Sequence, residues 1–162
     1  MFVENDAQKE HFFLLGLGSF LITHLFYLLA FLNVPTAKSQ GLFSQKKWLL
    51  LPFVIYLIGN TFFLWPDIPA DLRIAVFVYS SMIIAMTAGA INLKPILNTR
   101  TFNLLLLGVG LFVLSDSIIG LNKFKAHQIS LPYPRLLIMI PYLLGQYFIA
   151  KAGVLYHEKS QN

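Results

Sequence analysis

The chain has 162 residues, of which 57% are hydrophobic and only 12% are charged, and its formal net charge at pH 7 is +5. Soluble domains carry about 25% charged residues, and a chain of 18.4 kDa cannot bury this much apolar surface in its own core. The composition therefore excludes an ordinary soluble domain and indicates a protein whose main solvent is lipid. Because cysteine is absent, disulfides and thiolate metal sites are excluded as well.

Five segments reach the length of about 20 mostly apolar residues that a membrane-spanning helix requires. In chain order, the predicted helices cover residues 12–32, 47–64, 70–92, 101–121 and 132–156. Thr101 is the expected N-cap of the fourth helix, and Pro132 is the expected first residue of the fifth. Pro52 and Pro141 fall inside predicted helices, where neighbouring helices must satisfy the carbonyls that proline frees. The sequence predicts an all-α, polytopic membrane bundle that forms one domain over residues 1–162.

The loop charges give an expected orientation. Basic residues gather in the first and third loops and near the C-terminus, namely Lys38, Lys46, Lys47, Lys94, Arg100, Lys151 and Lys159. The second loop instead contains Asp67, and Asp71 follows it. The positive-inside rule then places the N-terminus outside and the C-terminus in the cytoplasm, although Lys123, Lys125 and Arg135 near the fourth loop oppose this assignment. The basic residues form no continuous run, so the net charge does not indicate a nucleic-acid partner.

Polar side chains deep inside a span are informative because hydrocarbon makes them costly. Asp116 is the only acidic residue well inside a predicted helix. Loss of hydration favours the uncharged carboxylic acid over the carboxylate, and a protonated carboxyl group can act as a general acid. A neutral aspartic acid can equally join helices by a hydrogen bond to Asn60 or to a backbone carbonyl. The sequence leaves both interpretations open.

Helix geometry gives an expected depth for each of these polar residues. With a rise of ~1.5 Å per residue and alternating helix directions, Asp116, Asn60, Tyr79 and Tyr142 are expected in one layer. His24 and Gln146 are expected beyond the middle of the bundle, on the opposite side. The resulting separation of ~10 Å in depth predicts no direct contact between His24 and Asp116. We therefore expect His24 and Gln146 mainly to link helices, with a catalytic role for His24 as the alternative.

Common catalytic and cofactor motifs are absent from the sequence. The four histidines, His11, His24, His127 and His157, lie in different segments, and no H-E-x-x-H is present, so no metal site is predicted. No G-x-S-x-G, P-loop or dinucleotide-binding motif occurs. Ser115 has no neighbouring histidine in the local sequence to activate it. No cofactor is therefore expected.

Three segments resemble the YhhN-type lysoplasmalogenase family. In the first predicted helix, Phe13, Gly16, Phe20, His24 and Tyr27 are similar to the family's F-x-x-G-x-x-x-F-x-x-x-H-x-x-Y pattern. The fourth helix reads GLFVLSDSIIGLNKF and resembles the family's G-x-L-F-x-x-S-D segment, which continues to an asparagine–basic–aromatic end. The fifth contains PYLLGQYFIAKAG, which resembles its Y-x-x-x-Q-x-x-I-x-x-G segment. Any one match is weak, but three in the right order are more specific, and they extend over nearly the whole chain.

The resemblance implies a fold of about eight helices with a Gly-Asp motif on a helix before the first one predicted here. We therefore expect the chain to correspond to the C-terminal part of such a fold. Residues Met1–Val3 and Glu4–Glu10 are then expected to be the end of the preceding helix and its loop. Without those helices, the chain is expected to lack activity on its own.

The resemblance also implies an activity, which is cleavage of the vinyl ether bond of a lysoplasmalogen to a fatty aldehyde and a glycerophospho-alcohol. Asp116 is then the expected acid, and His24 and Tyr27 are the other expected catalytic residues. The residues expected to contact the lysophospholipid are Asn60, Ser115, Tyr142, Gln146, Lys123 and Arg135. Its expected location is the bacterial inner membrane, where it crosses the bilayer several times.

Two alternatives to this activity stay open. The chain can be a non-catalytic membrane protein, such as a transporter fragment or a lipid-binding module, because polar residues inside a bundle also suit a proton or solute path. It can also be an enzyme of the same architecture that acts on another lipid.

Overall fold

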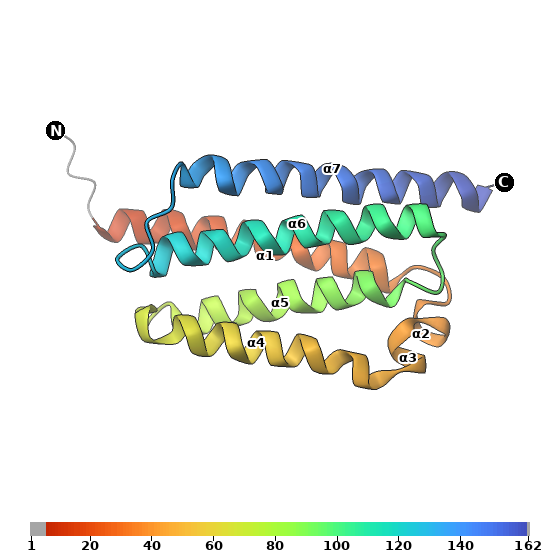
Figure 1. The fold of residues 1–162 in the computed structure, drawn as a ribbon, viewed down its shortest axis with the longest axis horizontal. Coiled ribbons are helices and arrows are strands. Elements are labelled where there is room, and N and C mark those ends of the chain that lie inside the picture. Colours follow the sequence, from red (N-terminus) through yellow and green to blue (C-terminus); the bar gives the residue numbers. More distant parts are fainter. Residues whose placement is uncertain (1–5, 162) are drawn as a thin grey trace.

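The computed structural model describes residues 6–161, and the side chains of residues 11–159. Five long helices run alongside one another in this part of the chain (Figure 1). They are α1 (Asp6–Leu32), α4 (Leu51–Leu64), α5 (Arg73–Asn92), α6 (Thr99–Phe124) and α7 (Pro134–Gln161). The short helices α2 (Ala37–Gln40) and α3 (Leu42–Gln45) connect α1 to α4, and single 3-10 turns extend α4 at both ends. The predicted all-α fold is confirmed.

Each long helix, with its flanking turns, contains a stretch that is long and apolar enough to cross a membrane. In the described part of the chain these are the five stretches His11–Leu32, Lys47–Asp67, Arg73–Asn92, Thr99–Phe124 and Pro134–Lys159. Most of their large apolar side chains point away from the protein interior; Phe62 is 83% exposed and Ile74 is 76% exposed. Water does not tolerate that much contiguous apolar surface. The fold is thus that of a multi-pass membrane protein.

The structure shifts several predicted boundaries. Helix α1 begins at Asp6, so the polar residues from Asp6 to Glu10 belong to the helix rather than to a loop, and residues 1–5 lie outside the described part. The N-cap of α6 is Asn98 instead of Thr101, because the Asn98 side chain accepts a hydrogen bond of 3.0 Å from the Thr101 backbone N–H.

The prolines also differ from expectation. Helix α7 begins at Pro134 rather than at Pro132, and Pro52 lies in the first turn of α4, where it costs no helical hydrogen bond. Pro141 is inside α7, as the sequence predicted.

Glycines allow the closest helix contact, which joins α6 to α7. A Cβ atom placed on Gly108 would lie 3.0 Å from the Gly145 carbonyl oxygen and 2.8 Å from the Ile149 side chain. Only glycine therefore lets these two backbones approach. Gly110, on the same helix as Gly108, makes no such contact among the described residues, because nothing lies within 4 Å of a Cβ placed there.

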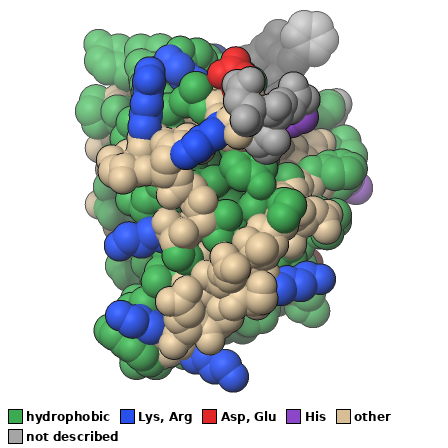
Figure 2. Space-filling model, turned by 90° about the vertical axis from the view of Figure 1, so that its right-hand side faces the viewer, with side chains coloured by type: hydrophobic (Ala, Val, Ile, Leu, Met, Phe, Trp, Pro, Cys, Tyr) green, Lys and Arg blue, Asp and Glu red, His purple; other side chains and the backbone are tan. Residues whose placement is uncertain are grey.

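The two ends of the bundle differ in charge. Figure 2 looks at the end where the C-terminus lies, and basic side chains (blue) surround it. The exposed basic residues of the connections at this end are Lys38, Lys46, Lys47, Lys94 and Arg100. At the opposite end, Asp67 after α4 forms an ion pair with buried Lys125 and contacts His127 at 3.1 Å. This cluster fastens the α6–α7 connection to the α4–α5 connection.

Candidate functional site

Three polar side chains from three helices meet inside the bundle. The Tyr79 hydroxyl on α5 donates a hydrogen bond of 2.9 Å to Oδ1 of Asp116 on α6. Nε2 of His24 on α1 lies 3.4 Å from Oδ2 of the same carboxyl group. The side chain of His24 is fully buried, and that of Asp116 is 6% exposed. A histidine and a carboxyl group are therefore held together away from bulk water.

The contact between His24 and Asp116 corrects the expectation that ~10 Å of depth separates them. That expectation assumed that the midpoints of the two helices lie level. In the structure α1 extends beyond α6 at the end where the N-terminus lies (Figure 1), and this shift along the bundle axis brings His24 level with Asp116. The faces of the helices follow from residue spacing, but their axial shift does not.

The hydrogen bonds of His24 determine where its protons lie. Nδ1 is 2.6 Å from the Phe20 carbonyl oxygen, which can only accept, so Nδ1 carries a hydrogen. Neither Nε2 of His24 nor Oδ2 of Asp116 has a hydrogen-bond partner elsewhere in the described chain. Two bare acceptors facing each other are unstable in a buried site. The pair is stable when it holds one proton, as neutral histidine with carboxylic acid or as imidazolium with carboxylate.

Aromatic rings surround this pair and exclude water from the histidine. The Phe112 ring packs edge-on against the His24 ring, with 5.3 Å between centroids, and the Tyr79 ring does the same at 5.7 Å. Phe112 is itself fully buried. Such packing holds the imidazole in one orientation, with Nε2 directed at the carboxyl group.

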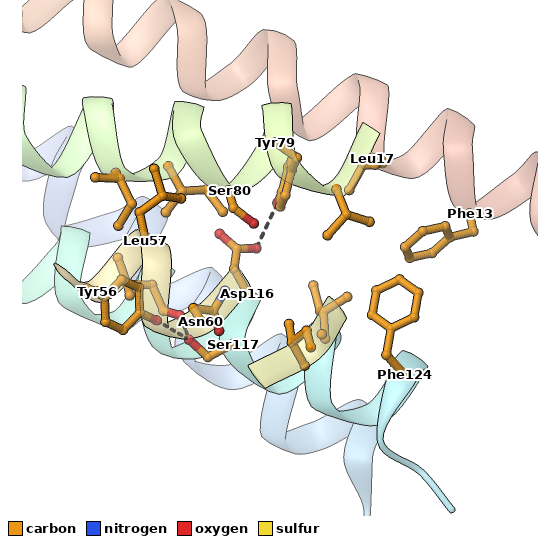
Figure 3. Close-up of a pocket in the computed structure, with 17 residues that line it drawn as sticks. Phe13, Leu17, Tyr56, Leu57, Asn60, Tyr79, Ser80, Asp116, Ser117 and Phe124 are labelled. Carbon is orange, nitrogen blue, oxygen red and sulfur yellow. Dashed lines mark hydrogen bonds between the residues drawn. The ribbon is translucent and has the colours of Figure 1, made fainter. Parts of the chain in front are cut away.

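A small cavity lies beside the Asp116 carboxyl group, between α1, α4, α5 and α6 (Figure 3). Groups the size of water can occupy about 60 Å³ of it. Its polar lining comprises Tyr56, Asn60, Tyr79, Ser80, Asp116 and Ser117. A water molecule takes ~30 Å³ in the liquid, so this space has room for a few waters.

A second polar cluster joins α1 to α7. The Tyr27 hydroxyl donates to Oε1 of Gln146, and Nε2 of Gln146 donates to the Tyr142 hydroxyl at 3.3 Å. The expected catalytic residue Tyr27 thus bonds Gln146 and packs edge-on against Phe112, with 6.1 Å between ring centroids. Gln146 links helices, as its position in the sequence suggested.

The structure separates the remaining predicted site residues. Ser115 is buried and donates a hydrogen bond of 3.0 Å to the Ile138 carbonyl oxygen, so its hydroxyl ties α6 to α7 one turn before Pro141. Lys123 lies over the Phe13 ring at 4.9 Å, near the cavity, and Arg135 is exposed in the first turn of α7. Asn60 lines the cavity with Asp116, but among the described residues no hydrogen bond joins the two.

Sequence reasoning placed Tyr79 in the layer of Asp116 but did not include it among the site residues. Its hydroxyl nonetheless makes the hydrogen bond to the carboxyl group. The feature of the sequence that could have identified Tyr79 was its depth in the third predicted helix, level with Asp116. In the part of the chain that the structure describes, no three histidine, cysteine or acidic side chains come together as they would around a metal ion.

A multi-pass helical membrane protein with a buried histidine–aspartate pair is the class that this fold and site define. The model of the YhhN family matches residues 2–153, so the chain belongs to the YhhN family. Two similar proteins are lysoplasmalogenase TMEM86A of Bos taurus, 31% identical over 151 residues, and lysoplasmalogenase TMEM86A of Homo sapiens, 31% identical over 150 residues. Each alignment covers 91% of this chain and 58% of the relative, so the chain spans less than two thirds of their length. No solved structure matches the chain.

Proposed function

We propose that this protein is a membrane hydrolase that cleaves the vinyl ether bond of lysoplasmalogens. The products are a fatty aldehyde and a glycerophospho-alcohol. Membership of the YhhN family and the similarity to proteins named lysoplasmalogenase support this substrate class. The observation that carries the proposal is the buried contact between His24 and Asp116, whose geometry suits a shared proton, because vinyl ether hydrolysis begins with proton transfer to carbon.

In the proposed mechanism, the pair transfers its proton to the β-carbon of the vinyl ether, and the double-bond electrons form the new C–H bond. The α-carbon and the ether oxygen then share the positive charge of an oxocarbenium ion, as in glycoside hydrolysis. The pair has become neutral histidine with carboxylate, and this negative charge stabilises the cation while Tyr79 donates to Oδ1. Water adds to the α-carbon and returns a proton to the pair. The hemiacetal collapses to the aldehyde and the free alcohol.

Lys123 is the proposed ligand of the lipid phosphate. It lies two turns beyond Asp116 on α6, a distance of ~10 Å along the helix axis. Roughly seven bonds separate the phosphorus from the vinyl β-carbon of a lysoplasmalogen, which extend over about 8 Å at the advance per bond of an extended chain. Lys123 also lies over Phe13, which lines the cavity. Arg135 is a proposed second phosphate ligand from α7.

Turnover decides this proposal. Purified protein in lipid nanodiscs is supplied with a lysoplasmalogen or with its saturated ether analogue, and aldehyde release is measured. We expect aldehyde only from the vinyl ether, because the saturated ether has no carbon that accepts the proton. Equal handling of both lipids, or binding without turnover, favours a non-catalytic lipid-binding protein instead.

The same assay addresses two further expectations. Comparing the 162-residue chain with any longer product of the same gene tests whether additional helices are needed for turnover. Fractionation of the source cells tests the predicted location in a bacterial cell membrane.

A further inference from the structure

The cavity beside Asp116 has a polar wall that none of the contacts described above uses. Asn60 on α4 and Ser80 on α5 both line it, and Figure 3 shows Asp116 between them. Neither side chain has a hydrogen-bond partner among the described residues. A carboxamide and a hydroxyl inside a membrane protein are costly unless something satisfies them.

The other polar groups that line the cavity already have hydrogen-bond partners. The Ser117 hydroxyl donates to the Val113 carbonyl oxygen at 2.7 Å, so the Tyr56 hydroxyl must be the donor in its 3.1 Å contact with Ser117. Tyr79 likewise uses its hydrogen on Oδ1 of Asp116. The groups left to bind a guest are therefore Asn60, Ser80 and the lone pair on Oδ1 of Asp116 that Tyr79 does not use.

A second, narrower space lies next to Asn60 and Ser80, toward the end of the bundle where α4 ends and α5 begins. It holds about 10 Å³ for water-sized groups, which is close to the minimum for one water molecule. Asn60 and Ser80 line both spaces, and the narrow one continues between α4 and α5 to Trp65 and Arg73. Arg73 is the first residue of α5 and of its membrane-spanning stretch. Asn60 and Ser80 thus stand between the polar end of the bundle and Asp116.

We propose that this cavity holds the water that hydrates the oxocarbenium ion, with Asn60 and Ser80 as the residues that position it. This inference rests on the proposed vinyl ether hydrolysis. The volume of about 60 Å³ fits a few waters beside the carboxyl group, and the Asn60 amide, the Ser80 hydroxyl and the Asp116 carboxyl group match the two to four partners of a buried water. The water oxygen forms a bond to the α-carbon, and the proton that it loses passes to the Asp116 carboxylate. The acid is then ready for another cycle.

The first test needs no turnover. A crystal structure of the full chain, at a resolution that shows water, is expected to contain ordered water within hydrogen-bond distance of Asn60, Ser80 and Asp116. Hydrocarbon in the cavity, or water that contacts Asp116 alone, would overturn the proposal. If the wild-type protein shows this water but does not hydrolyse vinyl ethers, the proposed function fails and the water site stands.

The second test is kinetic. Asn60→Leu keeps the volume and removes the polar group, so we expect kcat to fall on the order of tenfold to a hundredfold with KM unchanged. The solvent isotope effect on kcat should also fall, because water addition then limits the rate instead of proton transfer to carbon. Asn60→Ser should recover part of kcat, since its hydroxyl replaces the polar function of the carboxamide and leaves room for one more water.

Serines on α5 supply a matched pair of variants. Ser80→Ala should lower kcat, whereas Ser81→Ala should not, because the Ser81 hydroxyl bonds the Phe77 carbonyl of its own helix and does not line the cavity. A raised KM with normal kcat in Asn60→Leu would make Asn60 a lipid contact and refute the water role. An unchanged isotope effect at lowered kcat would refute it as well.

Discussion

The two polar clusters inside the bundle differ in how their hydrogen-bonding groups are satisfied. In the cluster of Tyr27, Gln146 and Tyr142, hydroxyl and amide groups donate to acceptors in the usual neutral way. In the other cluster, Nε2 of His24 and Oδ2 of Asp116 face each other and can be satisfied only by a proton held between them. The comparison teaches that burial alone does not distinguish the two clusters, whereas the unpartnered histidine and carboxyl atoms do, and they are the proposed reactive site.

Asp116→Asn is the variant expected to have the largest effect on turnover, and it tests the contrast between the two clusters most directly. The variant should fold, because the Asn Oδ1 can accept from Tyr79 while its amide donates to Nε2 of neutral His24. It has no acidic proton, so aldehyde release should fall by on the order of a thousandfold or more. Turnover of a lysoplasmalogen is the measurement, with Ser117→Ala as the control in the same cavity. Wild-type turnover in a folded Asp116→Asn protein would remove the carboxyl group from the mechanism.

His24→Phe tests the other half of the pair. The ring still fits the aromatic surroundings, but Asp116 loses the base that shares its proton. We expect a loss of activity of about a hundredfold, smaller than for Asp116→Asn because the acid itself stays. His11→Phe, at an exposed position near the end of α1, is the control. If both histidine variants turn over equally, His24 serves only to join helices.

Tyr79→Phe removes a single hydrogen bond from the carboxyl group and should have an intermediate effect. The carboxylate formed after proton transfer loses the donor at Oδ1, so kcat should fall about tenfold. Tyr56→Phe, which removes a hydroxyl from the same cavity without touching Asp116, should change kcat far less. Similar kcat values for the two variants would contradict a role of Tyr79 in stabilising the charge.

Gln146→Leu should have the smallest effect on chemistry. It breaks the hydrogen bond to Tyr27 between α1 and α7 and the one to Tyr142 within α7, and a hydrogen bond between membrane helices is worth about 1 kcal/mol or less. We expect a lower thermal unfolding midpoint in detergent, with turnover at low temperature within about threefold of wild type. Abolished turnover in a folded Gln146→Leu protein would extend the reactive site to the second cluster and end the contrast between them.

Much of the bundle follows from the sequence for a clear physical reason. Hydrocarbon requires every backbone group to be satisfied within a helix, so apolar segments of spanning length have few alternatives. That requirement determines the number and order of the spans. It also singles out Asp116, since an acid inside a span stands out against a lipid environment. The ends of the helices are weaker signals: Asn98 and Thr101 are both good cap residues, and only the backbone path selects Asn98.

The sequence placed His24 and Asp116 inside their spans, but the tertiary structure brought them into contact. A helix can slide along its neighbour by a turn while keeping the same residues on the same face, and side-chain packing selects one position. Here Leu28 of α1 packs against Gly89 of α5, and this close contact is part of the packing that determines the axial position of α1. The sequence by itself determined a membrane bundle with one buried acid. Only the tertiary structure decided that a histidine faces its carboxyl group, because that depends on how far one rigid helix is shifted against another.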